Sequence, residues 1–232
     1  MAIEFGLLTL GAYLLGSVPA AYLAARWSRG IDIRQCGDGN VGSTNLMRLT
    51  SKRIAIPVVI FDLGKGALMV WVAQLLGLDI PQQVTVGLAA IIGHNWPVFL
   101  HFNGGRGIFT SLGVISILAP WLGLIVLVIA YGLAPFHQLA VGVFLAVTFA
   151  PTGAWVLSQP LGVTDKLPIT LGSLAIFLIV LIRRSTAPRT IFTSSVPLGQ
   201  LLVNRLLFDR DIRDREAWIK QRPSQPEKQG KG

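Results

Sequence analysis

The amino-acid sequence predicts an all-α integral membrane protein with about seven transmembrane helices, two of them short. The first observation is composition: of 232 residues, 52% are hydrophobic and only 13% are charged, and the mean hydropathy is +0.62. This is too apolar for a single soluble domain of this length. The second is that the apolar residues fall into runs of the length that crosses a bilayer. The third is the distribution of Lys and Arg, which indicates orientation.

Apolar runs follow one another along most of the chain. They cover approximately residues 3–25, 54–77, 84–101, 107–134, 137–157 and 168–183. The fourth run contains Pro120, which removes a helical hydrogen-bond donor and clashes with the preceding turn. We therefore expect two short helices in that run. Ser17 and Pro19, at the end of the first run, indicate a kink where helices pack or, alternatively, a contact with substrate.

The basic residues predict the topology, because Lys and Arg near span ends stay in the cytoplasm. The loop 26–53 holds six of them and the segment after residue 182 holds eleven. Seven crossings with the N-terminus outside and the C-terminus in the cytoplasm leave only Lys166 outside. We thus expect a multi-pass protein of the cell (plasma) membrane. The positive-inside pattern and anionic headgroups explain the net charge of +9, so no nucleic acid is expected as a partner.

Three regions are expected along the chain. Residues 1–184 form the transmembrane domain with its glycine-rich cytoplasmic loops. Residues 185–222 form a cytoplasmic tail in which leucines recur at helical spacing, typical of an amphipathic helix on the membrane surface. Residues 223–232 are expected to be disordered. The single cysteine, Cys36, excludes an internal disulfide, and the first apolar run has no features of a cleavable signal peptide.

The loop 37–48 carries most of the polar residues that could bind a ligand. Glycines 37, 39 and 42 fit G-x-G-x-x-G, but no strand precedes them, so a dinucleotide site is not expected. Glycines let backbone N–H groups converge on an anion, and Arg48 can grip a phosphate with two hydrogen bonds. Alternatively, the glycines only turn the chain.

A second loop, 103–107, reads Asn-Gly-Gly-Arg-Gly and opens a helix. The topology places it on the same face as the first loop, and a helix N-terminus favours anions. Arg106 alone could be a positive-inside anchor. The two loops together favour phosphate binding.

Asp62 and Lys65 lie one helical turn apart in the second run, where we expect a structural ion pair. His94 is a candidate general base or a hydrogen-bonded structural histidine. The three histidines and one cysteine show no metal-ligand spacing, so no metal or cofactor is expected. No histidine is followed by an aspartate in the H-x-x-x-x-D spacing of the soluble-type glycerolipid acyltransferases.

Four ordered motifs together give the chain a specific resemblance. They are residues 16–19 (Gly-Ser-Val-Pro), residues 31–48, residues 62–66 (Asp-Leu-Gly-Lys-Gly) and residues 93–107. In this order they resemble the bacterial acyl-phosphate-dependent glycerol-3-phosphate acyltransferases, the PlsY family. The resemblance spans roughly residues 5–184. It implies a seven-helix membrane enzyme that moves an acyl chain from acyl phosphate to glycerol 3-phosphate, giving lysophosphatidate and phosphate.

The resemblance also implies site residues. Arg48 and Thr44 would hold phosphate, and Asn45 would shape the loop. The candidate catalytic residues are Arg48, Arg106 and Asp38. The candidate substrate-binding residues are Gly39, Asn40, Gly42, Thr44, Asn45, Gly104, Gly105 and His94. The expected partners are both substrates, membrane lipids and a soluble enzyme that makes acyl phosphate.

The chain departs from the family pattern at three places. Asp38 stands where the family usually has serine, Arg106 stands where it has lysine, and the segment 183–188 lacks the family's histidine and asparagine. Asp38 brings a negative charge toward two phosphates unless it caps a helix, pairs with an arginine or serves as a base. These departures suggest a rival function, a family member that lacks this catalysis and binds lipid phosphates or is a partner of another acyltransferase. The charged glycine loops at a membrane suggest a second rival, a small anion transporter.

Overall fold

The computed structural model describes residues 2–163, 165–187 and 196–220, and these residues fold into helices joined by loops. The α-helices are α1 (Ala2–Gly16), α2 (Ala20–Arg29), α3 (Ser43–Leu49), α4 (Lys52–Leu75), α5 (Ile80–Asn95), α6 (Ile108–Leu118), α7 (Pro120–Gly132), α8 (Leu139–Val156), α9 (Lys166–Ser185), α10 (Leu198–Phe208) and α11 (Arg215–Lys220). The 3-10 turns are η1 (Ile33–Gln35), η2 (Val98–Leu100) and η3 (Ala134–Phe136). This confirms the all-α prediction. The predicted disordered end, 223–232, lies outside the described residues.

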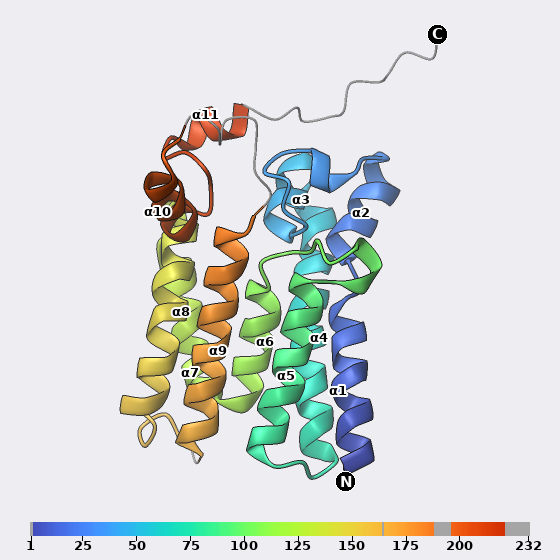
Figure 1. Ribbon diagram of the computed structural model, residues 1–232, viewed down its shortest axis with the longest axis vertical. Coiled ribbons are helices and arrows are strands. Elements are labelled where there is room, and N and C mark those ends of the chain that lie inside the picture. Colours follow the sequence, from blue (N-terminus) through green and yellow to red (C-terminus); the bar gives the residue numbers. More distant parts are fainter. Residues whose placement is uncertain (1, 164, 188–195, 221–232) are drawn as a thin grey trace.

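The long helices α1, α4, α5, α8 and α9 run along the long axis of the molecule, with the shorter α6 and α7 among them (Figure 1). Within this bundle α4 packs on α6, α1 on α5, α7 on α8, and α8 on α9. The short helices α2, α3, α10 and α11 gather at the end of the bundle opposite the N-terminus (Figure 1). The loops that carry the polar motifs lie at this same end.

The outer surface of the bundle is apolar. Among the residues that the structure describes, four helical stretches are long and apolar enough to cross a membrane: Ala2–Arg29, Lys52–Leu75, Leu139–Val156 and Lys166–Ser185. On α9 the aliphatic side chains that point outward recur every three or four residues and are 40–56% exposed: Leu167, Leu171, Leu174, Leu178 and Ile182. Exposed aliphatic side chains on the outside of a bundle are more stable in contact with lipid chains than with water. The fold is that of an integral membrane protein.

Two predicted helix boundaries are confirmed and one is wrong. α6 ends at Leu118 and α7 begins at Pro120, as the proline predicts. The chain also kinks at residues 17–19, where Ser17 is fully buried and donates to the Tyr13 carbonyl, so this motif serves packing. The run 84–101, however, is not one helix. α5 begins at Ile80 behind an Asp79 capping box and ends at Asn95, because a residue before a proline, here Trp96, disfavours helical backbone.

The described part of the C-terminal tail forms two helices, α10 and α11, whereas the leucine spacing suggested one. α10 ends because Asp209 adopts a left-handed backbone conformation with φ of 55°, which turns the chain before α11. The tail also buries polar groups against the bundle: Asn204, Arg205 and Asp211 are each less than 5% exposed. It is therefore packed on this end of the protein.

Backbones approach closely where the helices of the bundle cross. A Cβ atom on Gly66 of α4 would overlap the carbonyl oxygen of Thr110 on α6, and one on Gly113 of α6 would overlap the carbonyl oxygen of Leu63. Small residues at crossings are typical of membrane helices.

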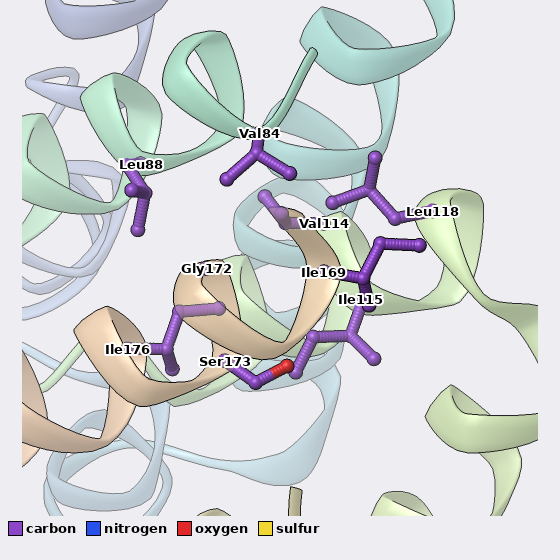
Figure 2. A pocket seen from close by; sticks show the side chains of 9 residues that line it. All are labelled: Val84, Leu88, Val114, Ile115, Leu118, Ile169, Gly172, Ser173 and Ile176. Carbon is purple, nitrogen blue, oxygen red and sulfur yellow. The ribbon is translucent and has the colours of Figure 1, made fainter. Parts of the chain in front are cut away.

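The interior between α5, α6 and α9 is closely filled. Aliphatic side chains surround a gap of only about 10 Å³, with Ser173 as the one hydroxyl residue among those drawn (Figure 2). This part of the bundle has no room for a ligand.

Candidate active site

The first glycine-rich loop is folded around the side chain of Asn45, which is fully buried at the start of α3. The Nδ2 atom of Asn45 donates to loop carbonyl oxygens at 3.3, 3.1 and 3.1 Å, those of Ile33, Cys36 and Asn40. Its Oδ1 atom accepts the N–H of Asp38 at 3.2 Å. Asn45 therefore shapes the loop. The expectation that it binds substrate directly is corrected, because its amide is committed to the backbone.

The glycines of this loop have different tasks. Gly37 and Gly39 have positive φ angles of 59° and 71°, and the N–H of Gly39 donates to the Cys36 carbonyl. These two glycines turn the chain, which is the plainer of the two interpretations of the sequence. Gly42 precedes α3, and no side chain caps the N–H groups of that helix's first turn. Amides from Gly42 onward are the ones left for an anion.

Asp38 pairs with Arg48 across the mouth of this loop. Its Oδ2 lies 3.2 Å from Nη1 of Arg48, and its Oδ1 accepts the N–H of Asn40 at 3.0 Å. Of the three roles considered for Asp38, the structure shows the pairing with an arginine. The Arg48 side chain remains 36% exposed, so a ligand can reach it.

The second loop does not form an amide cradle at its two leading glycines. The N–H of Gly104 donates to the carbonyl of Asn95 at 3.2 Å, and that of Gly105 donates to the carbonyl of His94 at 3.1 Å. These bonds satisfy the last carbonyls of α5. The expectation that Gly104 and Gly105 offer their N–H groups to substrate is therefore corrected. Both glycines serve close packing instead, since a Cβ on Gly105 would overlap Nε2 of His94.

Arg183 of α9 fixes this loop from the other side. Its guanidinium donates to the carbonyl oxygens of Gly105 at 3.0 Å and Gly104 at 2.7 Å, and to Oδ1 of Asn103 at 3.1 Å. Arg183 is buried, so these bonds are protected from water. The loop is thus held between α5 and α9, and Arg106 extends from a rigid base.

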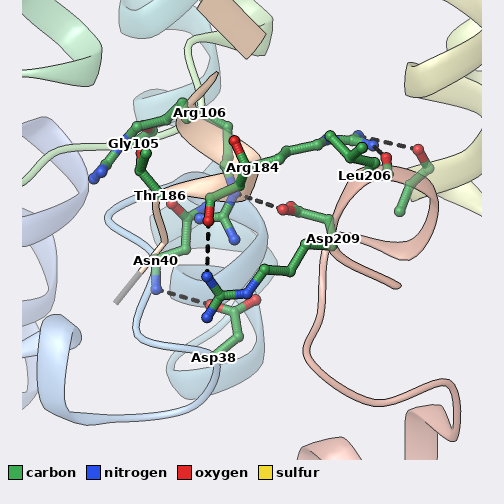
Figure 3. Close-up of polar contacts among 12 residues, drawn as sticks. Asp38, Asn40, Gly105, Arg106, Arg184, Thr186, Leu206 and Asp209 are labelled. Atoms are coloured by element: carbon green, nitrogen blue, oxygen red, sulfur yellow. Dashed lines mark hydrogen bonds and ion pairs between the residues drawn. The ribbon is translucent and has the colours of Figure 1, made fainter. Parts of the chain in front are cut away.

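Arg106 meets a carboxylate from the C-terminal tail. Its Nε lies 2.6 Å from Oδ1 of Asp209, a pair separated by 103 residues in sequence (Figure 3). Burial by itself lowers the pKa of an arginine, but the carboxylates of Asp209 and Asp38 outweigh it and raise the pKa of Arg106. Arg106 is therefore a permanent positive charge, and Asp38 of the first loop lies near enough to interact with it.

Asp62, Lys65 and His94 form a buried cluster below the two loops. The Nζ atom of Lys65 lies 2.8 Å from Asp62 Oδ1, 2.8 Å from His94 Nδ1 and 3.0 Å from the Gly16 carbonyl oxygen. Nδ1 of His94 also lies 3.4 Å from Asp62 Oδ1, so this ring nitrogen faces both members of the ion pair. The expected ion pair is confirmed.

Seven of the predicted residues come together around one cavity of about 440 Å³, whereas Gly39, Asn45, Gly104 and Gly105 do not line it. Its wall contains Asp38, Asn40, Gly42, Thr44, Arg48, His94 and Arg106 from the predicted set. Gly39 and Gly104 line a neighbouring cavity of about 100 Å³ that shares Asp38, Asn40 and Arg106. On the side toward the bundle the large cavity is apolar, with Ile108, Phe109, Tyr131, Leu139 and Val143. Arg48 and Arg106 thus face one space that is polar at one end and apolar at the other.

The wall also contains residues that were not predicted from the sequence. Arg184 reaches the cavity from α9, and Asp209, Arg210, Arg215 and Trp218 reach it from the tail. The adjacent arginines 183 and 184 at the end of the last apolar run were a usable signal. Nothing in the local sequence marks the tail residues. Within the described parts of the chain, no group of three or more His, Cys, Asp or Glu side chains is placed to hold a metal ion.

Fold and site together define a helical membrane protein with an arginine-lined cavity at one end of its bundle. Residues 6–194 match the family model described as glycerol-3-phosphate acyltransferase. The chain is 45% identical over 219 residues to glycerol-3-phosphate acyltransferase 5 of Dehalococcoides mccartyi, a match that covers 94% of each chain. The protein therefore belongs to the glycerol-3-phosphate acyltransferase family.

Solved structures agree with this membership. The chain is similar to PlsY, an integral membrane glycerol 3-phosphate acyltransferase, in its glycerol 3-phosphate form. The TM-score is 0.73 with 26% identity over 94% of this chain and 100% of that one. The lysophosphatidic acid form of the same enzyme gives a TM-score of 0.71 with 26% identity, over 94% of this chain and 98% of that one. The resemblance drawn from the four motifs is confirmed.

Proposed function

We propose that this protein transfers an acyl chain from acyl phosphate to a hydroxyl of glycerol 3-phosphate, giving lysophosphatidate, an early step of phospholipid synthesis. The observation that carries the proposal is the single cavity that Arg48 and Arg106 share, with an apolar wall beside them. Both substrates bear phosphate, and one bears a long chain. Family membership over residues 6–194 supports the reaction class.

In this reaction Arg48 and Arg106 are the phosphate-binding groups. Thr44 and the uncapped first turn of α3 add neutral donors beside Arg48. Asp38 pairs with the Arg48 guanidinium, so a substrate phosphate competes with its carboxylate for that group. His94 lines the cavity and supports the second loop, because its carbonyl oxygen accepts the N–H of Gly105.

The chemistry needs little from the protein beyond placement and charge. A hydroxyl oxygen of glycerol 3-phosphate attacks the acyl carbonyl carbon, and the bond from that carbon to the phosphate oxygen breaks. The hydroxyl proton leaves with the departing phosphate, so atoms and charges balance. Because acyl phosphate is already activated, no covalent enzyme intermediate is required. Arginines that neutralise the phosphate in the transition state and hold the two substrates close supply the rate enhancement.

The acyl chain lies against α6, α7 and α8. Ile108, Tyr131 and Val143 line both the large cavity and a small apolar cavity of about 20 Å³ deeper in the bundle. An alkyl chain extending from a phosphate at Arg106 would meet this apolar wall, where its burial is favourable.

The orientation of the protein in the membrane determines from which side the acyl donor arrives. Seven crossings, by α1, α4, α5, α6, α7, α8 and α9, place the N-terminus outside and the cavity at the cytoplasmic surface of the cell membrane. A soluble enzyme that makes acyl phosphate delivers the donor from that side, and membrane lipids surround the bundle. The clustering of Lys and Arg in the loop 26–53 and after residue 182 supports this orientation.

The test is an assay of the purified full-length protein with acyl phosphate and glycerol 3-phosphate. We expect lysophosphatidate from the wild type and a loss of at least about tenfold in kcat/KM for Arg48→Ala and Arg106→Ala. Arg53→Ala is the matched control, because Arg53 is exposed and does not line the cavity. Wild-type protein that makes no more product than Arg48→Ala would refute the proposal. Phosphate binding without product would then favour the non-catalytic lipid-phosphate binder, whose motivation is the departure from the family pattern at Asp38 and in the segment 183–188.

A further inference from the structure

The wall of the cavity continues beyond the part of the chain that matches the family model. That match ends at residue 194, and the tail adds five residues to the wall. These are Phe208, Asp209, Arg210, Arg215 and Trp218. The tail therefore contributes to the site through residues that the family match does not assign.

Specific contacts seat the tail on the bundle. The guanidinium of Arg184 donates to the carbonyl of Leu206 in α10. Arg205 of α10 donates to the Ser185 carbonyl at 2.8 Å and pairs with Asp211 at 2.7 Å. All the charged groups in these contacts are buried. Buried charged groups of this kind hold a segment in one arrangement.

The seated tail adds positive charge to the cavity. Five arginines line it, namely 48, 106, 184, 210 and 215, against the three aspartates 38, 62 and 209. Asp62 is already paired with Lys65 below the cavity. The positive charges of the wall thus exceed the negative ones, and repulsion among them is relieved by an anion.

Arg210 is the tail residue with the clearest capacity for a ligand. Its guanidinium lies 5.2 Å from the ring of Phe208, which orients it. Its Nε is buried and finds no hydrogen-bond acceptor among the described residues. Burial is the main cause that lowers the pKa of Arg210. The nearby charges of Arg215 and Arg48 lower this pKa further, while the carboxylate of Asp214 opposes them. Arg210 and Arg48 are thus two guanidiniums in mutual range at one cavity.

We propose that Arg210 and Arg48 together bind a substrate phosphate group, which makes a second phosphate site beside the one at Arg106. The inference rests on the proposed function, which brings two phosphate-bearing molecules into one cavity. Guanidiniums bind phosphate through paired N–H donors, and a dianion between two of them removes their repulsion. The occupant is the phosphate of either glycerol 3-phosphate or acyl phosphate.

Steady-state kinetics of Arg210→Gln test the inference and identify the occupant. We expect the KM for one of the two substrates to rise by about tenfold or more, as the loss of a charge-assisted hydrogen bond implies. Arg213→Gln is the matched control, because Arg213 is exposed in the same segment and does not line the cavity. Arg210→Lys should recover part of the affinity that Arg210→Gln loses, since lysine keeps the positive charge but lacks the paired N–H donors of the guanidinium. Equal KM values for Arg210→Gln and Arg213→Gln would overturn the inference.

A binding measurement separates this inference from the proposed function. Inorganic phosphate should raise the thermal unfolding midpoint of the wild type and of Arg213→Gln more than that of Arg210→Gln. Unfolding midpoints without phosphate show whether each variant folds. If the wild type makes no lysophosphatidate but this difference is seen, the reaction is wrong and the phosphate site stands. If the wild type is active and phosphate stabilises all three proteins equally, the site is wrong and the reaction stands.

Discussion

Asp38 faces two groups of its own loop, the guanidinium of Arg48 and the N–H of Asn40. The hydrogen bond to Asn40 is an Asx turn, which serine can also make through its hydroxyl. The contact to Arg48 is different, because it depends on charge. Asp38 therefore combines a structural role that serine could fill with an electrostatic role that it could not.

We predict that Asp38→Ser strengthens substrate binding. The carboxylate repels phosphate and competes for Arg48, and removing a repulsion of about 1 kcal/mol or more lowers KM by about fivefold or more. The KM for each substrate, measured with purified protein, checks this. Asp38→Asn is the companion variant, because it keeps the Asx turn and removes only the charge, so both variants should behave alike. A rise in KM in both would show that Asp38 positions Arg48 for substrate.

Residues of the glycine-rich loops that line the cavity could be picked out from sequence, but the hydrogen bonds of their backbone N–H groups could not. Backbone N–H groups look alike in a sequence, and only the fold shows which are already bonded. Gly104 and Gly105 use theirs on the end of α5, which begins and ends at different residues from the apolar run that suggested it. The position of Arg48 and Arg106 at a cavity was easier to predict, because an arginine in a polar loop of a membrane protein has few other roles.

At the scale of elements, crossings between helices depend on single glycines. The motif 62–66 contains two glycines, Gly64 and Gly66, which lie two residues apart in α4. At Gly64 a Cβ would meet nothing within 4 Å, whereas at Gly66 it would overlap the Thr110 carbonyl of α6. Because that obstacle is backbone, a rotamer change cannot relieve it.

We predict that Gly66→Ala destabilises the protein and that Gly64→Ala does not. Overpacking at a backbone contact costs about 1–3 kcal/mol, while alanine in an open helical position is neutral or stabilising by up to about 1 kcal/mol. Thermal unfolding midpoints in one detergent compare the two variants directly. Gly66→Ala should also lower activity, because α6 begins at the cavity and would be displaced. Equal midpoints for the two variants would show that the α4–α6 crossing is looser than described.

The helix break at Pro120 was predicted, whereas the end of α5 before Pro97 and the helix ends set by distant contacts were not. Pro120 acts locally, so the break between α6 and α7 follows from the sequence. The turn at Asp209 depends on the buried contacts that seat α10 and on the pair with Arg106. Leucine spacing alone could not reveal it, because the periodicity says nothing of where a helix stops.

At the scale of the whole molecule, the all-helical membrane fold could be predicted because hydropathy and charge act along the chain. The site could be predicted only in part, because it depends on which loops and helix ends come together in the fold. The two glycine-rich loops were expected together on grounds of topology, and they line one cavity. The contribution of the tail depends on the pair between Arg106 and Asp209, 103 residues apart, for which no local pattern exists.

The predicted topology can be tested with two single-cysteine variants in a Cys36→Ala background. Ser28 and Gln159 are both exposed, and they lie at opposite ends of the bundle, Ser28 in α2 and Gln159 after α8. Because Lys and Arg cluster at the end that carries Ser28, the positive-inside rule places Gln159 outside. A membrane-impermeant maleimide on intact cells should label Gln159→Cys and leave Ser28→Cys unlabelled until the cells are permeabilised. The cysteine-free background controls for unspecific labelling. Labelling of Ser28→Cys alone in intact cells would reverse the topology and place the arginine-lined cavity on the outer surface, where a soluble cytoplasmic enzyme could not deliver acyl phosphate.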